Sequence, residues 1–221
     1  MNESTDQEPI DQGPFDPEPP RDGPPWEQTE LDLFAKVKQT IVGVVSNPME
    51  FFAELRRAGG IFPPYLFYLL VAWPAVVVGT LLQAPFDMMM GSSGGEAMIM
   101  FFVVLFLTPI FLFIGLIISA GLTHLGLMVF GGANHPFEAT YRVNAYAYGG
   151  VAWLSAIPFC GSTIAFIWGI VLEIIGVAKV QEISTGKAAA AVLVPLAVVF
   201  MVFICIAVVF AGVIAAAVGS M

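Results

Sequence analysis

Residues 143–172 read VNAYAYGGVAWLSAIPFCGSTIAFIWGIVL and contain no Asp, Glu, Lys or Arg. A single helix through this stretch would place Arg142 and Lys179 on opposite sides of a membrane. A break at Pro158–Phe159–Cys160–Gly161–Ser162 returns the chain and leaves both bases on one side, which the charge rule for membrane loops favours. We therefore expect two short helices near the lower length limit for spanning, over residues 144–159 and 163–178.

Three other long stretches also lack charged residues, and each holds the ~20 apolar residues that cross a bilayer core. They predict membrane-spanning helices over residues 61–82, 97–130 and 188–221. The second helix is longer than one bilayer crossing, so it is tilted or projects beyond the membrane. The sequence thus predicts an all-α integral membrane protein, in which five transmembrane helices make up a domain over residues 61–219.

Composition and charge placement support this class. Apolar residues make up 58% of the chain, more than one soluble core can hide. The seven bases between residues 33 and 221 all fall in the segments that five spans would leave on one side. Under the positive-inside rule, this predicts a multi-pass protein of the cell inner membrane with its N-terminus in the cytoplasm and its C-terminus outside.

Residues 1–32 hold ten acids and one base, and they are rich in proline. Such a segment has too little apolar surface to offset the entropy of ordering, so we expect a disordered cytoplasmic tail. The rest of the chain has seven bases and seven acids, so the net charge of −9 belongs to this tail. Without a basic patch, nucleic-acid binding is excluded as a function class.

Residues 33–60 have the pattern of two amphipathic helices. In the first, apolar residues recur at helical spacing from Phe34 to Val45. In the second, Asn47 fits an N-cap with Glu50 completing a capping box, and Gly59 fits the helix end. We expect both helices to lie in the lipid headgroup layer, and the alternative is that they pack on the bundle.

Polar residues inside or beside the predicted spans are the candidate functional residues. Glu173 is the acid inside a span, and such a residue is either functional or a hydrogen-bonded structural group. His124 is isolated from other metal ligands, which favours a packing role over a metal or proton site. Arg142, Asn144 and Tyr146 lie near a cytoplasmic boundary, where an interfacial tyrosine belt and a site for a lipid headgroup or a partner are both possible.

Enzyme motifs are not found. The sequence contains no G-x-S-x-G or H-E-x-x-H motif, and no paired carboxylates lie inside a span. We expect no catalytic residue, no metal and no cofactor. Small residues at helical spacing instead favour close helix packing and possible self-association; they are Gly115, Ser119, Gly169, Gly176, Ala207, Ala211 and Ala215.

Several short motifs together resemble the Yip domain family, the Ypt/Rab-interacting proteins, in its bacterial form. They are Asn47–Pro48–Met49–Glu50–Phe51–Phe52, Gly131–Gly132, Phe137 to Tyr146, Ile157–Pro158–Phe159–Cys160–Gly161, Ile167–Trp168–Gly169 and Gly186–Lys187–Ala188. The similarity covers about residues 33–215 and implies a cytosolic N-terminal tail, a five-helix domain and no catalytic residue. Eukaryotic members act in vesicle traffic with Rab GTPases, and this tail lacks their Asp-Leu-Tyr-Gly-Pro-like segment.

The leading functional hypothesis is a non-enzymatic membrane protein that organises the membrane or recruits partners through its cytoplasmic side. Its expected partners are membrane lipids and either other proteins or a second copy of itself. The alternative is a small permease, channel or lipid transporter that uses Glu173 and His124 in a polar path.

Overall fold

The computed structural model describes residues 23–219, with side chains through Gly212. All regular elements of this part are helices. In chain order they are η1 (Pro25–Glu27), α1 (Leu33–Ser46), α2 (Pro48–Ala53), α3 (Phe62–Met89), α4 (Gly94–Val129), α5 (Phe137–Val151), η2 (Ala152–Ala156), α6 (Gly161–Val180) and α7 (Thr185–Gly219).

Helices α3, α4, α6 and α7 are each long and apolar enough to cross a membrane. The 15 residues of α5 make a shorter helix, which the 3-10 helix η2 continues. Four candidate spans are therefore established within the described residues, and a fifth crossing by α5 and η2 stays a prediction.

The break predicted at residues 158–162 lies between η2, which ends at Ala156, and α6, which begins at Gly161. Helices α5 and α6 pack against each other on either side of it. Phe159 adopts a φ of 67°, which is rare for a bulky residue, and its ring meets Phe86 of α3 at 5.1 Å in an edge-to-face pair. The turn is thus packed against α3.

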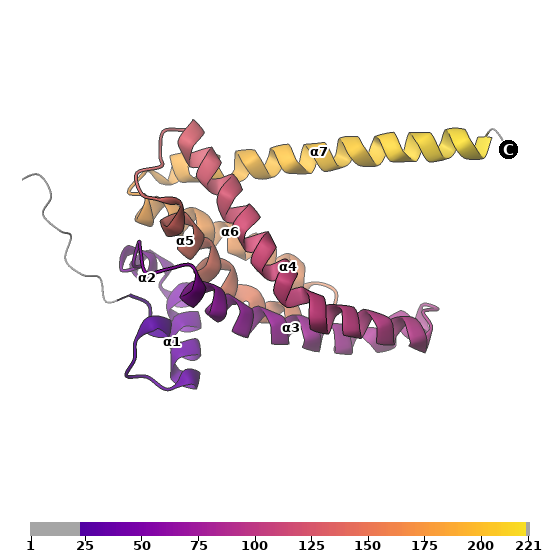
Figure 1. Cartoon of the computed structure of the whole chain (residues 1–221), viewed down its shortest axis with the longest axis horizontal. Coiled ribbons are helices and arrows are strands. Elements are labelled where there is room, and N and C mark those ends of the chain that lie inside the picture. Colours follow the sequence, from indigo (N-terminus) through magenta and orange to yellow (C-terminus); the bar gives the residue numbers. More distant parts are fainter. Residues whose placement is uncertain (1–22, 220–221) are drawn as a thin grey trace, which may run out of the picture.

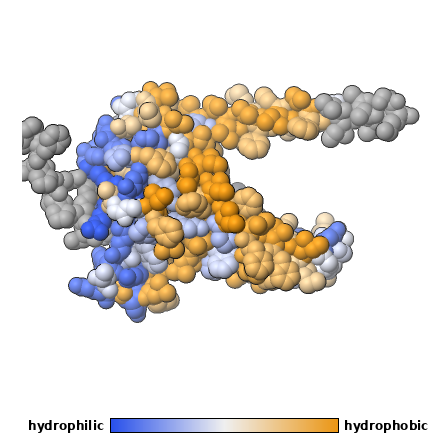
Figure 2. Space-filling model, in the orientation of Figure 1, coloured by the Kyte–Doolittle hydropathy of each residue, from blue (hydrophilic) through white to orange (hydrophobic). Residues whose placement is uncertain are grey.

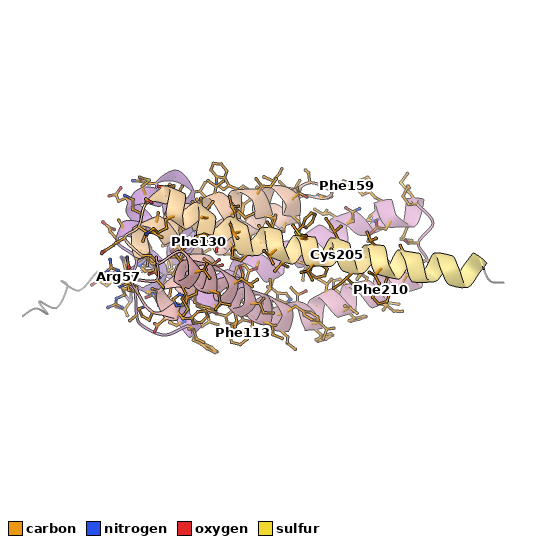
Figure 3. All side chains as sticks on the ribbon, turned by 90° about the horizontal axis from the view of Figure 1, so that it is seen from above. Arg57, Phe113, Phe130, Phe159, Cys205 and Phe210 are labelled. Atoms are coloured by element: carbon orange, nitrogen blue, oxygen red, sulfur yellow. The ribbon has the colours of Figure 1, made fainter. Side chains whose placement is uncertain are left out.

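The helices form a broad end and two diverging arms (Figure 1). Helices α1 and α2 lie at the broad end, while the α3–α4 hairpin and α7 extend away from it (Figure 1). Hydrophilic residues gather at the broad end, and hydrophobic residues cover most of the α3–α4 hairpin and the coloured part of α7 (Figure 2). Arg57 lies at the broad end and Phe210 far along α7 (Figure 3). This distribution suits a protein whose arms lie in lipid.

The N-terminal helices differ in part from the sequence prediction. Asp32 caps α1 by accepting a hydrogen bond from the Ala35 amide at 2.6 Å. The capping box predicted for α2 is wrong, because the Asn47 side chain donates to the Glu50 carboxylate and caps no backbone amide. Helix α2 also ends at Ala53, six residues before Gly59. The Phe52 side chain is buried in the core. Helix α2 therefore packs on the bundle, which was the alternative to a position in the headgroup layer.

Helix α1 packs on the surface of the bundle against α5. Val44 is buried in the core, while Phe34 and Val42 are exposed. An exposed apolar side of this kind suits the headgroup layer, where apolar side chains reach the acyl region. The position of α1 in that layer stays a prediction.

We predict that reporters fused after Ser92 and after Thr185 report opposite sides of the membrane. Ser92 lies in the loop between α3 and α4, and Thr185 begins α7 beside the broad end. An alkaline phosphatase fusion should be active only at Ser92, and a green fluorescent protein fusion should fluoresce only at Thr185. The same compartment at both sites would contradict the arrangement.

Candidate functional site

Helix α5 carries two polar faces. Thr140, Asn144 and Tyr148 recur every four residues and share one face, while Arg142 and Tyr146 share the opposite face. Twelve of its 15 residues are buried, which is unusual for a helix with this polar content. Each face must therefore find hydrogen-bond partners on neighbouring helices.

The first face meets Glu173, whose side chain is only 1% exposed. One carboxylate oxygen accepts from the Thr123 hydroxyl at 2.6 Å and from the Asn144 amide at 3.0 Å. The other oxygen accepts from the Tyr148 hydroxyl at 2.8 Å. This Glu173 cluster joins α4, α5 and α6 through a carboxylate with both oxygens hydrogen-bonded.

A chain of hydrogen bonds continues from this cluster towards the broad end. The Asn144 amide also donates to the Thr140 carbonyl at 3.2 Å. The Thr140 hydroxyl lies 3.0 Å from Nδ1 of His124 and accepts from the Gln181 amide at 3.1 Å. Gln181 in turn accepts from the backbone amide of His135 at 2.7 Å, which ties the loop before α5 to the end of α6.

The second face meets the N-terminal segment. The Arg142 side chain is fully buried, and each of its three nitrogen atoms donates a hydrogen bond. Nε donates to the Arg56 carbonyl at 2.7 Å, and Nη1 donates to the Gly60 carbonyl at 3.0 Å. Nη2 forms an ion pair with Glu27, which also accepts from the Tyr146 hydroxyl at 2.6 Å. We call these residues the Glu27–Arg142 cluster.

Local sequence explains how residues so far apart meet. Pro25 starts η1, where its fixed φ suits the first helical position. The neighbouring Trp26 packs on Phe67 at 5.8 Å and donates to the Pro63 carbonyl at 2.7 Å. On the other side, Gly60 has a φ of +90°, a conformation open to glycine, and its carbonyl reaches Arg142. The N-terminal segment is thereby held on α3 and α5.

Two sequence predictions are corrected by this cluster. Residues 25–27, placed in the disordered tail, form a helix with partners in the bundle, while residues 1–22 lie outside the described part. The prediction that tyrosines here form a belt at the membrane interface is also wrong for Tyr141 and Tyr146, because both side chains are fully buried. Their neighbours are protein groups, including Phe67, whose ring lies 5.4 Å from that of Tyr146.

The five candidate residues predicted from the sequence fall into two groups in the structure. Asn144 contacts Glu173 directly, Arg142 and Tyr146 share Glu27, and His124 is linked through Thr140. Glu27 was missed because it stands in an acidic, proline-rich segment. The adjacent Trp26 was an available signal, since a large aromatic side chain is costly to leave in water.

The space beside Glu173 is small. A cavity of about 40 Å³ lies between Ser119, Thr123, Tyr148, Glu173 and α7, which is room for a few water molecules. Within the described residues, no three His, Cys, Asp or Glu side chains lie close enough together to hold a metal ion. The arrangement can therefore fix helix positions and hold a proton or a water molecule.

A family model for the Yip1 domain matches residues 42–217, which is most of the chain. The chain belongs to the Yip1 domain family. Comparisons with curated proteins and with solved structures give no match. The match includes α5 and α6, so the Glu173 cluster lies wholly inside the Yip1 domain, whereas Glu27 lies before it.

The small residues of this Yip1 domain have different surroundings. A Cβ on Gly169 would lie 2.5 Å from the Tyr148 ring, and one on Gly176 would lie 2.6 Å from Val143. These two glycines thus permit close packing inside the bundle. Gly115 has open space beside it and Ala211 is exposed, while Ala215 lies beyond the described side chains.

We predict that Glu173→Ala destabilises the protein by about 2–5 kcal/mol, because it removes the acceptor that Thr123, Asn144 and Tyr148 share. Glu173→Gln should cost about 1 kcal/mol, since the amide oxygen still accepts two of these hydrogen bonds. Thermal unfolding in detergent measures both effects. Glu54→Ala, at an exposed carboxylate, is the control, and equal midpoints for Glu173→Ala and this control would contradict the prediction.

Proposed function

We propose that this Yip1 domain protein is a non-enzymatic anchor that organises the membrane or recruits protein partners through its cytoplasmic side. The ion pair between Glu27 and Arg142 carries the proposal. It holds the N-terminal segment on the broad end of the bundle, so that the preceding residues start from a fixed place.

The charge of the preceding residues suits a cytosolic docking arm. Residues 1–22 contain seven acids and one base. The cytoplasmic leaflet carries a negative surface potential, which repels an acidic segment and directs it into the cytosol. A partner with a basic surface would be attracted by the same charge.

Orientation follows from the positions of the bases. Arg57 pairs with Glu182, and the Lys187 ammonium donates to the Gly131 carbonyl, so bases from the loop before α3 and from α7 lie at the broad end. We infer that this end faces the cytoplasm of a cell with an inner membrane, where the positive-inside rule places such residues. The exposed apolar side of α1 would then rest in the inner leaflet.

The transport alternative has less support. Both oxygens of Glu173 are hydrogen-bonded within the protein, and the adjacent cavity of about 40 Å³ is far smaller than the ~300–1,000 Å³ of small-molecule sites. His124 is bound to Thr140 on the same helix face that holds Asn144. These contacts favour a structural role for the buried polar residues.

We predict that converting all seven acids of residues 1–22 to their amides lowers partner capture at least about tenfold, because the electrostatic attraction is lost. The measurement is quantitative cross-linking of the tagged full-length protein in native membranes. Insertion and unfolding temperature should stay unchanged, because Glu27 is retained.

The matched control is Glu96→Gln, which removes a carboxylate at the opposite end and retains a residue suited to its capping box. Its captured proteins should equal those of the wild type. Unchanged capture by the amide variant would overturn the proposal that the acidic arm recruits partners.

A further inference from the structure

A second cavity lies at the end of the bundle opposite Arg57. Helices α3 and α4, η2, the turn that follows it and the start of α6 border an open cavity of about 320 Å³, within the size range of small-molecule sites. Its polar lining residues are Thr80, Gln83, Asp87, Ser155 and Ser162, and the rest of its wall is apolar. It shares no lining residue with the Glu173 cavity.

Tight packing defines the walls of this Asp87 cavity. A Cβ on Gly79 would overlap the Ser155 carbonyl oxygen, so η2 lies directly against α3. Phe159 forms the wall on the turn side, where its ring packs on Phe86. The cavity is therefore bounded by helix contacts on two sides.

The charges around the cavity favour a ligand with separated positive and negative groups. Asp87 is the charged residue among the lining residues, and it lies in the last turn of α3, where the helix dipole is also negative. Its carboxylate accepts a hydrogen bond from Gln83 at 3.2 Å, and no base lines the cavity. Across the cavity, Ser162 supplies a hydroxyl in the first turn of α6, whose N-terminal end is positive.

The surroundings point to a lipid as the source of this ligand. Met100 and Phe159 line the cavity and are themselves 57% and 71% exposed, and Met88 nearby is 51% exposed. In a membrane these side chains contact acyl chains. Asp87 lies near the end of the α3–α4 hairpin, at the depth where a span gives way to headgroups.

We propose that the Asp87 cavity binds the headgroup of a zwitterionic phospholipid that carries a primary amine. The ammonium group donates to the Asp87 carboxylate, and the phosphate accepts from the Ser162 hydroxyl and the first turn of α6. The acyl chains leave past Met100 and Phe159. This site is independent of the acidic arm and lies at the other end of the molecule.

Native mass spectrometry of the full-length protein, titrated with phosphatidylethanolamine, phosphatidylcholine or phosphatidylglycerol in detergent, tests the proposal. We expect phosphatidylethanolamine to bind most tightly. Phosphatidylcholine should bind less, because its quaternary ammonium has no N–H to donate. Asp87→Asn should weaken phosphatidylethanolamine binding about tenfold, because it removes a charge-assisted hydrogen bond.

Glu96→Gln is the matched control, since this carboxylate lies at the same end of the molecule but outside the cavity. This variant should bind phosphatidylethanolamine as tightly as the wild type does. Ser162→Phe, at an exposed position, should fill the cavity and abolish binding. If folded Asp87→Asn or Ser162→Phe binds phosphatidylethanolamine as tightly as the wild type does, the lipid does not bind in the Asp87 cavity. If the three lipids bind equally tightly, the assignment of the headgroup is wrong. If soluble glycerophosphoethanolamine binds as tightly as phosphatidylethanolamine, the ligand need not be a lipid, and that part of the proposal is wrong.

Discussion

The buried guanidinium of Arg142 constrains how this membrane protein is built. An arginine side chain stays charged at any physiological pH, so its burial requires a full set of acceptors. Glu27 and two backbone carbonyls supply them, and these groups come from segments that precede the first candidate span. The N-terminal segment and the loop before α3 must therefore fold back onto α5. This contact holds residues 25–27 and the loop before α3 against α5.

The two polar faces of α5 explain the arrangement of the other helices. Lipid offers no hydrogen bonds to Asn144 or Tyr148, so a helix with such residues is stable only when protein surrounds it. Helices α4 and α6 supply Thr123 and Glu173 on one side, and the N-terminal segment covers the other. The most apolar helices, α4 and α7, are left to face lipid, and their membrane-length segments are only 6% buried. The Yip1 domain thus keeps its polar groups inside and presents hydrocarbon outside.

The sequence was sufficient for the four helices that could cross a membrane and for the break before α6, because charge-free stretches and the Pro158–Gly161 break reflect the same cost of exposing polar groups to lipid. It also pointed to Glu173 as a residue that is either functional or hydrogen-bonded between helices. The sequence did not reveal the role of Glu27. This residue lies in an acidic, proline-rich segment with no helical pattern, so nothing in the sequence indicated its contact with Arg142, 115 residues away. The sequence also misplaced Tyr146, because sequence shows which residues share a helix face but not whether protein or lipid covers that face.

A double-mutant cycle between Glu27→Gln and Arg142→Met tests the central claim most directly, because it isolates the coupling between these two side chains. Unfolding free energies of the four proteins in the same detergent supply the cycle. We expect a coupling free energy of at least about 1 kcal/mol, with Arg142→Met alone costing about 3–5 kcal/mol. Additive effects of the two substitutions, with no coupling, would contradict a docked N-terminal segment.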